Sequence, residues 1–314
     1  MDPRAKSTRA TAFAPAAITN FFEINYDSSF LAVGATGGGY ILSKGTRSLA
    51  TFSKSSKPEV LTTVNGDRSY NARTTRKAVE LLLSVSGREQ GAMRLDQTVE
   101  TPIGSGFGAS GASATSAVYA AAAAAGIGKR KRDLALFAHR AEIIEQTGLG
   151  TVSVVFNHSG AGAITVPGEP GDAKFTTVPV PKGTRIVTAF LAPYDKKDAL
   201  SSERMSRRIN QLGHRALEGF LSDPTLDNLA NEGERFSAGL GLETPEVKKL
   251  IALAKSAGAR HASQNMIGYS VHSITDSDRS ERVARSMAGV SKEIRVDTFE
   301  VGRVRAGVLK PSRR

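Results

Sequence analysis

Thr101-Pro102-Ile103-Gly104-Ser105-Gly106-Phe107-Gly108-Ala109-Ser110-Gly111-Ala112-Ser113 is the stretch of sequence that decides the fold. It is rich in glycine and small polar residues, and it runs directly into an alanine-rich segment, residues 114–125. Alanine has the best intrinsic helix propensity, so this segment is predicted to be a helix. Glycine lets the backbone approach a ligand closely, and the N–H groups at a helix start point toward negative charge. The stretch therefore predicts an anion-binding loop that leads into a helix.

Two common phosphate motifs do not account for this loop. The P-loop pattern requires a lysine, and the loop contains none. A Gly-x-Gly-x-x-Gly pattern is present at residues 106–111, but the acidic partner expected about 20 residues later falls in the basic run 129–132. The alternative is a purely structural loop, where a helix packs closely on a sheet.

The composition indicates a globular protein. The 314 residues are enough for two domains, and 40% hydrophobic with 23% charged residues is typical of folded chains. No apolar run is long enough to cross a bilayer, so no membrane partner is expected, and residues 1–12 lack the apolar segment of a secretory signal. The sequence has no cysteine, which excludes disulfides and thiolate chemistry and is compatible with the cytoplasm.

The formal net charge of +12 allows two interpretations. A basic protein can bind the phosphate backbone of nucleic acids, with clusters here at residues 129–132, 204–208 and 311–314. However, only 6% of residues are aromatic and tryptophan is absent, so platforms for base stacking are scarce. A solvated basic surface that attracts anionic substrates is therefore favoured, and nucleic acid is an unlikely partner.

Local patterns predict a mixture of strands and helices. Alternating and β-branched runs predict strands at 9–22, 40–42, 49–52, 60–64, 93–99, 151–157, 185–191, 267–274 and 294–299. Helices are predicted at 71–86, 114–125, 134–146 (capped by Asp133), 201–221 and from Thr244-Pro245 to Gly258. Residues 34–39 and 160–172 are expected to form turns and loops, and the tail after Gly307 is expected to fray. The mixture fits an α+β fold with two lobes.

The glycine-rich loop resembles motif two of the GHMP kinases, whose pattern is Pro-x-x-x-Gly-Leu-Gly-Ser-Ser-Ala. The matching residues, in order, are Pro102, Gly106, Phe107, Gly108, Ala109, Ser110 and Gly111. The second serine of the pattern, a Mg²⁺ ligand in that family, falls on Ser110. Ala109 replaces the first serine, which does not affect the metal ligand.

Further stretches make the resemblance more specific, toward the archaeal pantoate kinases. They are residues 14–22, with Ile-Thr-x-Phe-Phe; residues 138–142, with Ala-His-x-x-Glu; residues 147–152, with Thr-Gly-Leu-Gly-Thr-Val; residues 167–171; and residues 263–271. In those kinases a histidine is common near Ala17 and a glycine near Asn20, so the first match is imperfect. The resemblance covers about residues 13–274, and motifs in the same order are more specific than any one alone.

This resemblance implies a two-lobed GHMP-kinase-like fold with the phosphate-binding loop between the lobes. Residues 1–160 would be the ATP-binding domain and residues 161–314 the C-terminal domain. The residues implied for ATP are Pro102, Gly104, Ser105, Gly106, Phe107, Gly108, Ala109 and Ser110. Ser110 and Glu142 would hold Mg²⁺, although a solvated glutamate is the alternative for Glu142. The substrate wall would comprise Thr19, Asn20, Phe21, Gly37 and Gly38.

Thr151 is the main departure from the family, because many GHMP kinases have an aspartate there. Threonine cannot act as a base at neutral pH. Either catalysis needs no base, or another group such as His139 takes the proton. A structural role for His139 is the favoured alternative. The other histidines (His158, His214, His261 and His272) are scattered without the spacing of metal ligands.

The resemblance implies an ATP-dependent kinase that phosphorylates the primary hydroxyl of pantoate, giving 4-phosphopantoate on the way to coenzyme A. A GHMP kinase for another small alcohol, such as homoserine or a mevalonate-type acid, is the first alternative. The second is a non-catalytic basic protein that binds nucleic acid or another anion. ATP, Mg²⁺ and pantoate are the expected ligands, and a homodimer is the expected assembly. The sequence does not indicate which cation meets the substrate carboxylate.

Overall fold

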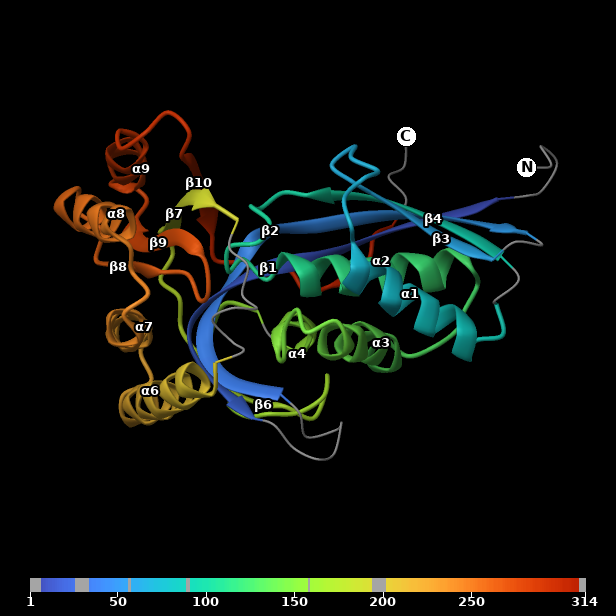
Figure 1. Ribbon diagram of the computed structural model, residues 1–314, viewed down its shortest axis with the longest axis horizontal. Helices are drawn as coiled ribbons and strands as arrows, with labels where there is room; N and C mark the ends of the chain where they lie inside the picture. Colours follow the sequence, from blue (N-terminus) through green and yellow to red (C-terminus); the bar gives the residue numbers. More distant parts are fainter. Residues whose placement is uncertain are drawn as a thin grey trace.

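The larger of two sheets runs through most of the molecule (Figure 1). The computed structural model describes residues 7–25, 34–55, 58–88, 91–157, 159–193 and 202–310. Within them the larger sheet has the order β11-β1-β2-β4-β3, and β5 and β6 extend it beside β2. Its strands are β1 (Thr8–Asn25), β2 (Gly34–Lys54), β3 (Glu59–Val64), β4 (Gly91–Val99), β5 (Ala161–Val166), β6 (Lys174–Val178) and β11 (Gly307–Val308). Only the β3–β4 pair among them is parallel.

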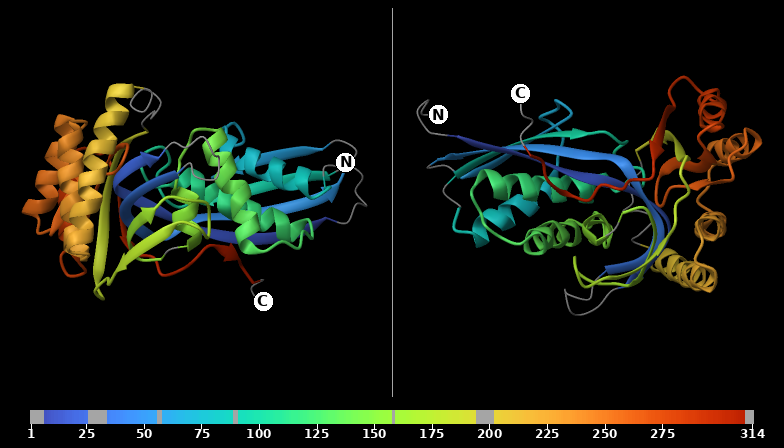
Figure 2. Two further views of the ribbon diagram at one scale, coloured as in Figure 1. Left: turned by 90° about the horizontal axis from the view of Figure 1, so that it is seen from below. Right: turned by 180° about the vertical axis from the view of Figure 1, so that it is seen from behind.

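Strands β1 and β2 form a long antiparallel ribbon that bends away from the rest of the sheet (Figure 2). The register shifts between Pro15 and Ala17 and again between Thr19 and Phe21. An extra residue in one strand bends it and increases its twist. The turn expected at residues 34–39 is wrong, because this segment pairs with β1 and its glycines also pair with β5. Pairing with β1 and β5 satisfies the backbone N–H and C=O groups of this segment, and glycine permits the three strands to approach closely.

Helices α1 (Arg73–Val85), α2 (Ala109–Ala124) and α3 (Lys131–Ile144) cover one face of the larger sheet (Figure 1). Almost every side chain of α2 is buried, and its alanines let it lie close to the sheet and to both neighbouring helices. Ser113 and Ser116 share hydrogen bonds with Thr46 and Ser48 of β2, at 3.1 and 2.7 Å between the hydroxyl oxygens. The predicted helix at 114–125 is confirmed, with its start moved back to Ala109.

The smaller sheet has the order β10-β7-β9-β8. Its strands are β7 (Thr184–Ala192), β8 (His261–Gln264), β9 (Tyr269–Asp276) and β10 (Arg295–Glu300), all antiparallel. Helices α8 (Pro245–Ser256) and α9 (Ser280–Ala288) cover it, whereas α6 (Glu203–Ser222) and α7 (Leu226–Leu240) pack on the outer side of the bent ribbon (Figure 2). The predicted α+β fold with two lobes is confirmed. The division at residue 160 stays a prediction, and β5, β6 and β11 all lie in the larger sheet.

Helix α4 (Thr151–Asn157) forms where the sequence predicted a strand. The run is β-branched, which favours strands, but tertiary contacts decide its structure. The backbone N–H of Val152 donates to the buried carboxylate of Glu142, at 3.2 Å. Val152 and Val155 are both buried, and their spacing of three residues places them on one side of a helix.

Other expectations need smaller corrections. Asp133 does not cap α3, which begins at Lys131; instead its carboxylate pairs with Arg130 at 2.9 Å. Strand β5 lies within the loop expected at 160–172. The predicted strand at 267–274 starts at Tyr269, and helices α7 and α9 were not predicted. The tail does not fray at Gly307, since β11 pairs with β1. The basic cluster at residues 311–314 and His158 lie outside the described residues.

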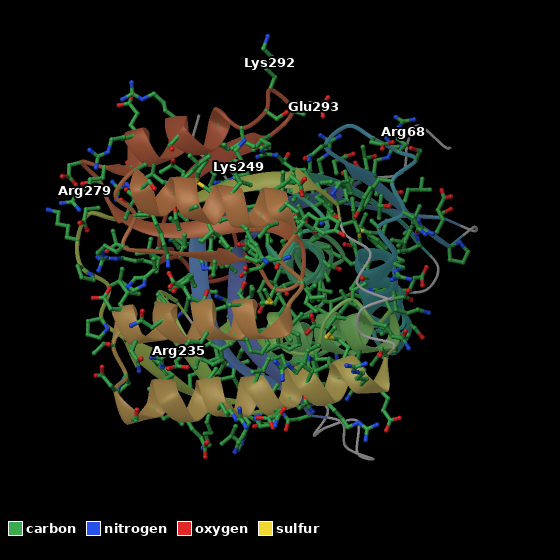
Figure 3. All side chains as sticks on the ribbon, turned by 60° about the vertical axis from the view of Figure 1, so that its left-hand side comes forward. Arg68, Arg235, Lys249, Arg279, Lys292 and Glu293 are labelled. Carbon is green, nitrogen blue, oxygen red and sulfur yellow. The ribbon has the colours of Figure 1, made fainter. Side chains whose placement is uncertain are left out.

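Charged side chains of both signs cover the helical face of the smaller lobe (Figure 3). Arg235 and Arg279 lie beside the carboxylates of Glu232 and Asp278. A stripe of basic side chains is the usual electrostatic footprint of nucleic-acid binding. Within the described residues this face carries both signs of charge, so it is not such a stripe. None of the helices that the structure describes is both long enough and apolar enough to span a membrane.

Candidate nucleotide and substrate site

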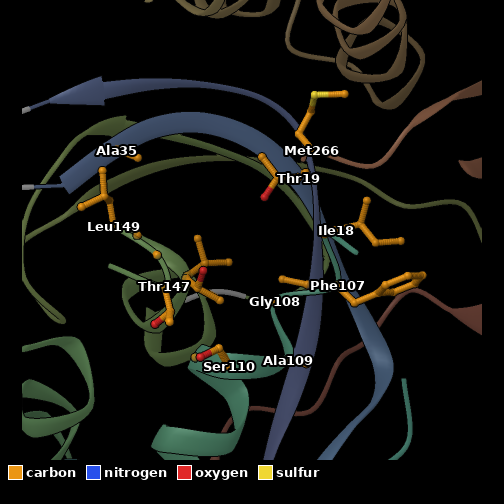
Figure 4. A pocket seen from close by; sticks show the side chains of 18 of the residues that line it. Ile18, Thr19, Ala35, Phe107, Gly108, Ala109, Ser110, Thr147, Leu149 and Met266 are labelled. Atoms are coloured by element: carbon orange, nitrogen blue, oxygen red, sulfur yellow. The ribbon is translucent and has the colours of Figure 1, made fainter. Parts of the chain in front are cut away.

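A cavity of about 1040 Å³ lies where the two lobes meet (Figure 4). Its walls are the glycine-rich loop, the start of α1, the bent end of the β1–β2 ribbon and residues 146–151 between α3 and α4. The predicted site residues that line it are Thr19, Phe21, Gly37, Gly38, Gly104, Ser105, Gly106, Phe107, Gly108, Ala109, Ser110 and Thr151. The predicted residues that do not line it are Pro102, Asn20, His139 and Glu142.

The glycine-rich loop takes a backbone path that favours glycine. Gly104, Gly106 and Gly108 have φ angles of 82°, 79° and 62°, in the left-handed region that residues with a Cβ rarely adopt. A Cβ on Gly108 would also lie 2.9 Å from Cγ2 of Thr151. Gly108 is the N-cap of α2, and no side chain caps that helix end. The uncapped N–H groups at the wall of the cavity are suitable for binding phosphate.

Residues of the smaller lobe hold the loop in place. The Ser270 hydroxyl donates to the carbonyl of Ser105, at 2.6 Å, and the Ser105 hydroxyl donates to the carbonyl of Ala192, at 2.7 Å. Behind them, Nδ1 of His272 lies 2.8 Å from Oδ1 of Asn265. Burial lowers the pKa of His272 to about 3, so this histidine is neutral at physiological pH. The smaller lobe therefore holds the loop through hydrogen bonds on both sides of Ser105.

Glu142 lies directly behind the cavity wall and is 1% exposed. Its Oε1 accepts the N–H of Val152 and lies 3.4 Å from Nδ1 of His139. Its Oε2 has no hydrogen-bond partner, and this oxygen faces the cavity-lining residues Gly111 and Gly148: a Cβ added to them would lie 3.3 and 2.7 Å from it. A buried carboxylate oxygen without a partner is costly, so this atom is a candidate ligand for a cation.

His139 is fully buried and does not reach the cavity. Among the described residues its hydrogen-bonding neighbour is Glu142, and its Nε2 has no partner. A histidine in this position cannot take a proton directly from a substrate in the cavity. The alternative that His139 takes that proton therefore has no geometric support, whereas a structural contact with Glu142 does.

Thr151 stands at the start of α4, between the loop and Glu142. Its hydroxyl oxygen and Oε2 of Glu142 both lie near Gly148, at 3.2 and 2.7 Å from a Cβ built there. Its methyl group contacts the loop at Gly108 and Gly111. The side chain therefore presents a hydroxyl, and no charge, between the loop and Glu142.

A chain of hydroxyl groups crosses the floor of the cavity. The Ser110 hydroxyl donates to Oγ1 of Thr74, at 3.0 Å, and Oγ1 of Thr74 lies 2.9 Å from Oγ1 of Thr147. Sequence analysis missed Thr74, because nothing in the pattern of α1 connects it with the loop. Thr147 was part of a recognised motif but had no assigned role.

These residues fit a Mg²⁺ ion. Mg²⁺ prefers oxygen ligands and is usually bound by one or two carboxylates together with phosphates and waters. The unpartnered Oε2 of Glu142 and the hydroxyl of Ser110 are such oxygens. No group of three or more His, Cys, Asp or Glu side chains suited to a metal occurs within the described part of the chain, so the ion would depend on the nucleotide for further ligands.

The bent ribbon forms the opposite wall of the cavity. Thr19, Phe21, Gly37 and Gly38 line it as predicted. Asn20 does not: its side chain points away and donates to Oη of Tyr40, at 2.6 Å, and to the carbonyl of Leu229, at 3.2 Å. The side chains of a strand alternate between its two faces, so a run of neighbouring residues cannot all face one ligand.

Comparisons with known proteins agree with this geometry. Residues 73–156 match the GHMP kinases N terminal domain. The chain is 27% identical to a pantoate kinase of Methanospirillum hungatei over 289 residues, which cover 91% of this chain and 93% of that protein. It is 25% identical to a pantoate kinase of Methanocaldococcus jannaschii, over 86% of this chain and 94% of that protein.

Solved structures share the fold. A phosphotransferase related to the CoA biosynthesis pathway superposes with a TM-score of 0.84 at 24% identity, over 97% of this chain and 99% of the other. A homoserine kinase from Cytophaga hutchinsonii superposes with a TM-score of 0.68 at 18% identity, over 96% and 97% of the two chains. The chain therefore matches the GHMP kinases N terminal domain over residues 73–156, shares its fold with these solved structures, and is similar to archaeal pantoate kinases over most of its length.

Proposed function

We propose that the protein transfers the terminal phosphoryl group of ATP to the primary hydroxyl of pantoate, giving 4-phosphopantoate for coenzyme A synthesis. One observation carries this proposal: the glycine-rich loop, the start of α1 and the bent ribbon line a single cavity, with the unpartnered oxygen of Glu142 behind its wall. One end, at the start of α1, would take the nucleotide. The other end, at the bent ribbon, would take the acceptor alcohol.

The ribbon end suits pantoate in two respects. Pantoate carries two methyl groups on the carbon next to its reacting CH₂OH group, and Ala35, Leu149 and Ile164 provide apolar walls there (Figure 4). Thr19 and Thr36 add hydroxyl groups to the same wall. No lysine or arginine of the described residues lines this end, so we propose that hydroxyls and backbone N–H groups meet the carboxylate.

The chain would assist phosphoryl transfer mainly by position and charge, as is usual for this reaction. Backbone N–H groups of the loop would hold the phosphates, and Ser110 and Glu142 would hold Mg²⁺. When bound, Mg²⁺ would supply positive charge beside the phosphate oxygens. Thr151 would orient the acceptor hydroxyl through its own hydroxyl, and His139 would hold the Glu142 carboxylate in place. No Asp, Glu or His side chain of the described residues lines the cavity, so we propose a reaction without a side-chain base.

The test is a substrate panel. The purified protein is incubated with ATP, Mg²⁺ and one of pantoate, homoserine or mevalonate, and ADP release and phosphorylated product are measured. The proposal expects turnover with pantoate alone, and mass and NMR spectra that place the phosphate on the primary hydroxyl. If homoserine or mevalonate is phosphorylated and pantoate is not, the substrate is that other alcohol. Salt-sensitive RNA binding with no turnover would favour the non-catalytic alternative. A cytoplasmic location and a homodimer stay predictions.

A further inference from the structure

The cavity contains one positively charged side chain among its described lining residues, and that side chain is Arg73. Arg73 is the first residue of α1, and it lies outside every motif that the sequence analysis used. Residues 70–75 line the cavity as a continuous segment, so Arg73 is part of its wall. The other cationic side chains of α1, Arg76 and Lys77, do not line the cavity.

The start of α1 is fixed against the phosphate loop. Thr74, the next residue, is 3% exposed, and its Oγ1 accepts a hydrogen bond from Ser110 at 3.0 Å. Thr147 lies 2.9 Å from the same oxygen and ties the start of α1 to the segment after α3. Ser110 is the residue proposed to hold Mg²⁺ beside the phosphates. The position of Arg73 relative to bound phosphates is therefore set by a short, packed connection.

The guanidinium of Arg73 is available for a stronger partner. Its side chain is 40% exposed, and its ion pair with Glu145 is long, with Nε 3.8 Å from Oε2. Partly exposed ion pairs of this length contribute little to stability. A phosphate group offers several charged oxygens to the planar fork of an arginine, and such charge-assisted pairs are among the stronger hydrogen bonds.

The side of the cavity decides which anion Arg73 meets. Ala35, Ile164 and Leu149 mark the ribbon end, where a Cβ on Gly150 would lie 3.4 Å from Ile164 and 3.6 Å from Ala35. Ser110 lies away from Ala35 and Leu149 (Figure 4), and its hydroxyl bonds Thr74 of α1, the residue after Arg73. The ribbon end, where the acceptor acid is proposed to bind, is therefore remote from Arg73, which is next to the residue that bonds Ser110.

We propose that Arg73 binds the β- or γ-phosphate of ATP from the α1 side of the cavity, exchanging its contact with Glu145 for a phosphate oxygen. This proposal rests on the proposed function only in taking ATP as the nucleotide. It does not depend on which alcohol is phosphorylated. It assigns the cation of the site to the nucleotide and leaves the ribbon end without one.

The test measures nucleotide binding to the full-length protein by calorimetry, without any acceptor acid. Wild type, Arg73→Gln and the matched control Lys77→Gln are titrated with MgATP and with AMP at several salt concentrations. We expect Arg73→Gln to weaken MgATP binding about 10- to 100-fold, the range of a hydrogen bond to a charged group. AMP lacks the β- and γ-phosphates, so its affinity should stay within about threefold of wild type. Lys77→Gln should bind both nucleotides like wild type.

Two further measurements keep the interpretation unambiguous. Arg73→Lys keeps the charge but loses the planar fork, so it should bind MgATP with an affinity between those of wild type and Arg73→Gln. Unliganded melting temperatures establish that each variant is folded. Wild-type MgATP affinity in Arg73→Gln would overturn the proposal, and so would an equal loss for AMP and MgATP. A raised KM for the acid with unchanged MgATP affinity would also overturn it, by placing Arg73 at the acceptor. Failure of pantoate turnover in the substrate panel would leave these binding results unaffected.

Discussion

Replacing Glu142 by glutamine tests the metal site most directly, because the substitution keeps the shape of the side chain and removes its charge. The amide oxygen can still accept the N–H of Val152, which now bonds Oε1 at 3.2 Å. The amide nitrogen would then take the place of Oε2, which has no partner and faces Gly111 and Gly148. The fold should therefore persist while the proposed Mg²⁺ ligand is lost.

We expect Glu142→Gln to lower kcat by about 10²–10³, the usual cost of removing one electrostatic contact that acts on a transition state. Turnover is followed by coupled ADP release at saturating ATP and pantoate while Mg²⁺ is varied. Mn²⁺ binding in the presence of an unreactive ATP analogue is measured separately. Asp133→Asn, on the exposed start of the same helix, is the control and should behave like wild type. Near-wild-type turnover of Glu142→Gln at limiting Mg²⁺ would refute the assignment.

Four other substitutions test the remaining parts of the site. Gly108→Val should weaken ATP binding in a titration by about tenfold or more, because a left-handed φ costs a residue with a Cβ on the order of 1–3 kcal/mol. Thr151→Val should raise the barrier by only about 0.5–1.5 kcal/mol, one neutral hydrogen bond, and a loss of several orders of magnitude in kcat would contradict the base-free reaction. His139→Gln should raise the half-saturating Mn²⁺ concentration by about 10- to 100-fold, as substitutions of residues that contact a metal ligand do. Loss of turnover with unchanged Mn²⁺ binding would argue against the role of His139 in holding the Glu142 carboxylate in place. The pKa of His272 is lowered to about 3 from 6.5, so between these pH values the unfolded chain binds more protons than the folded protein. The free energy of unfolding should therefore fall by up to about 1.4 kcal/mol per pH unit below pH 6.5. Chemical denaturation of His272→Gln should give a smaller slope, and an equal slope would contradict the assignment.

Much of the fold follows from sequence patterns, where local preference and tertiary packing agree. The amphipathic helices α1, α6 and α8 and the apolar strand β7 formed close to their predicted positions. Residues 151–157 differ because a hydrogen bond to Glu142 and burial of two valines outweigh a β-branched composition. Residues 34–39 differ because glycines that are typical of turns here permit strands to approach closely.

The sequence predicted those parts of the candidate site whose residues lie in contiguous motifs. Those motifs led to the glycine-rich loop, Glu142 and Thr151, and the structure brings these three together. Asn20 was misjudged because membership of a motif does not say which way a side chain points. Thr74 was missed because it reaches the loop only through the packing of α1 on α2, which no local pattern encodes, and Arg73 was missed with it.

The bracing of the phosphate loop by the smaller lobe has a consequence for the order in which the protein becomes functional during synthesis. A Cβ on Gly268 would lie 2.5 Å from the Cα of Ser105, and Ser270 bonds the carbonyl of that same residue. The loop leaves the ribosome more than 150 residues before these partners do. We therefore expect the growing chain to be unable to bind ATP tightly until residues 265–270 have been added, so that nucleotide binding reports on a chain that already has both the loop and its bracing residues.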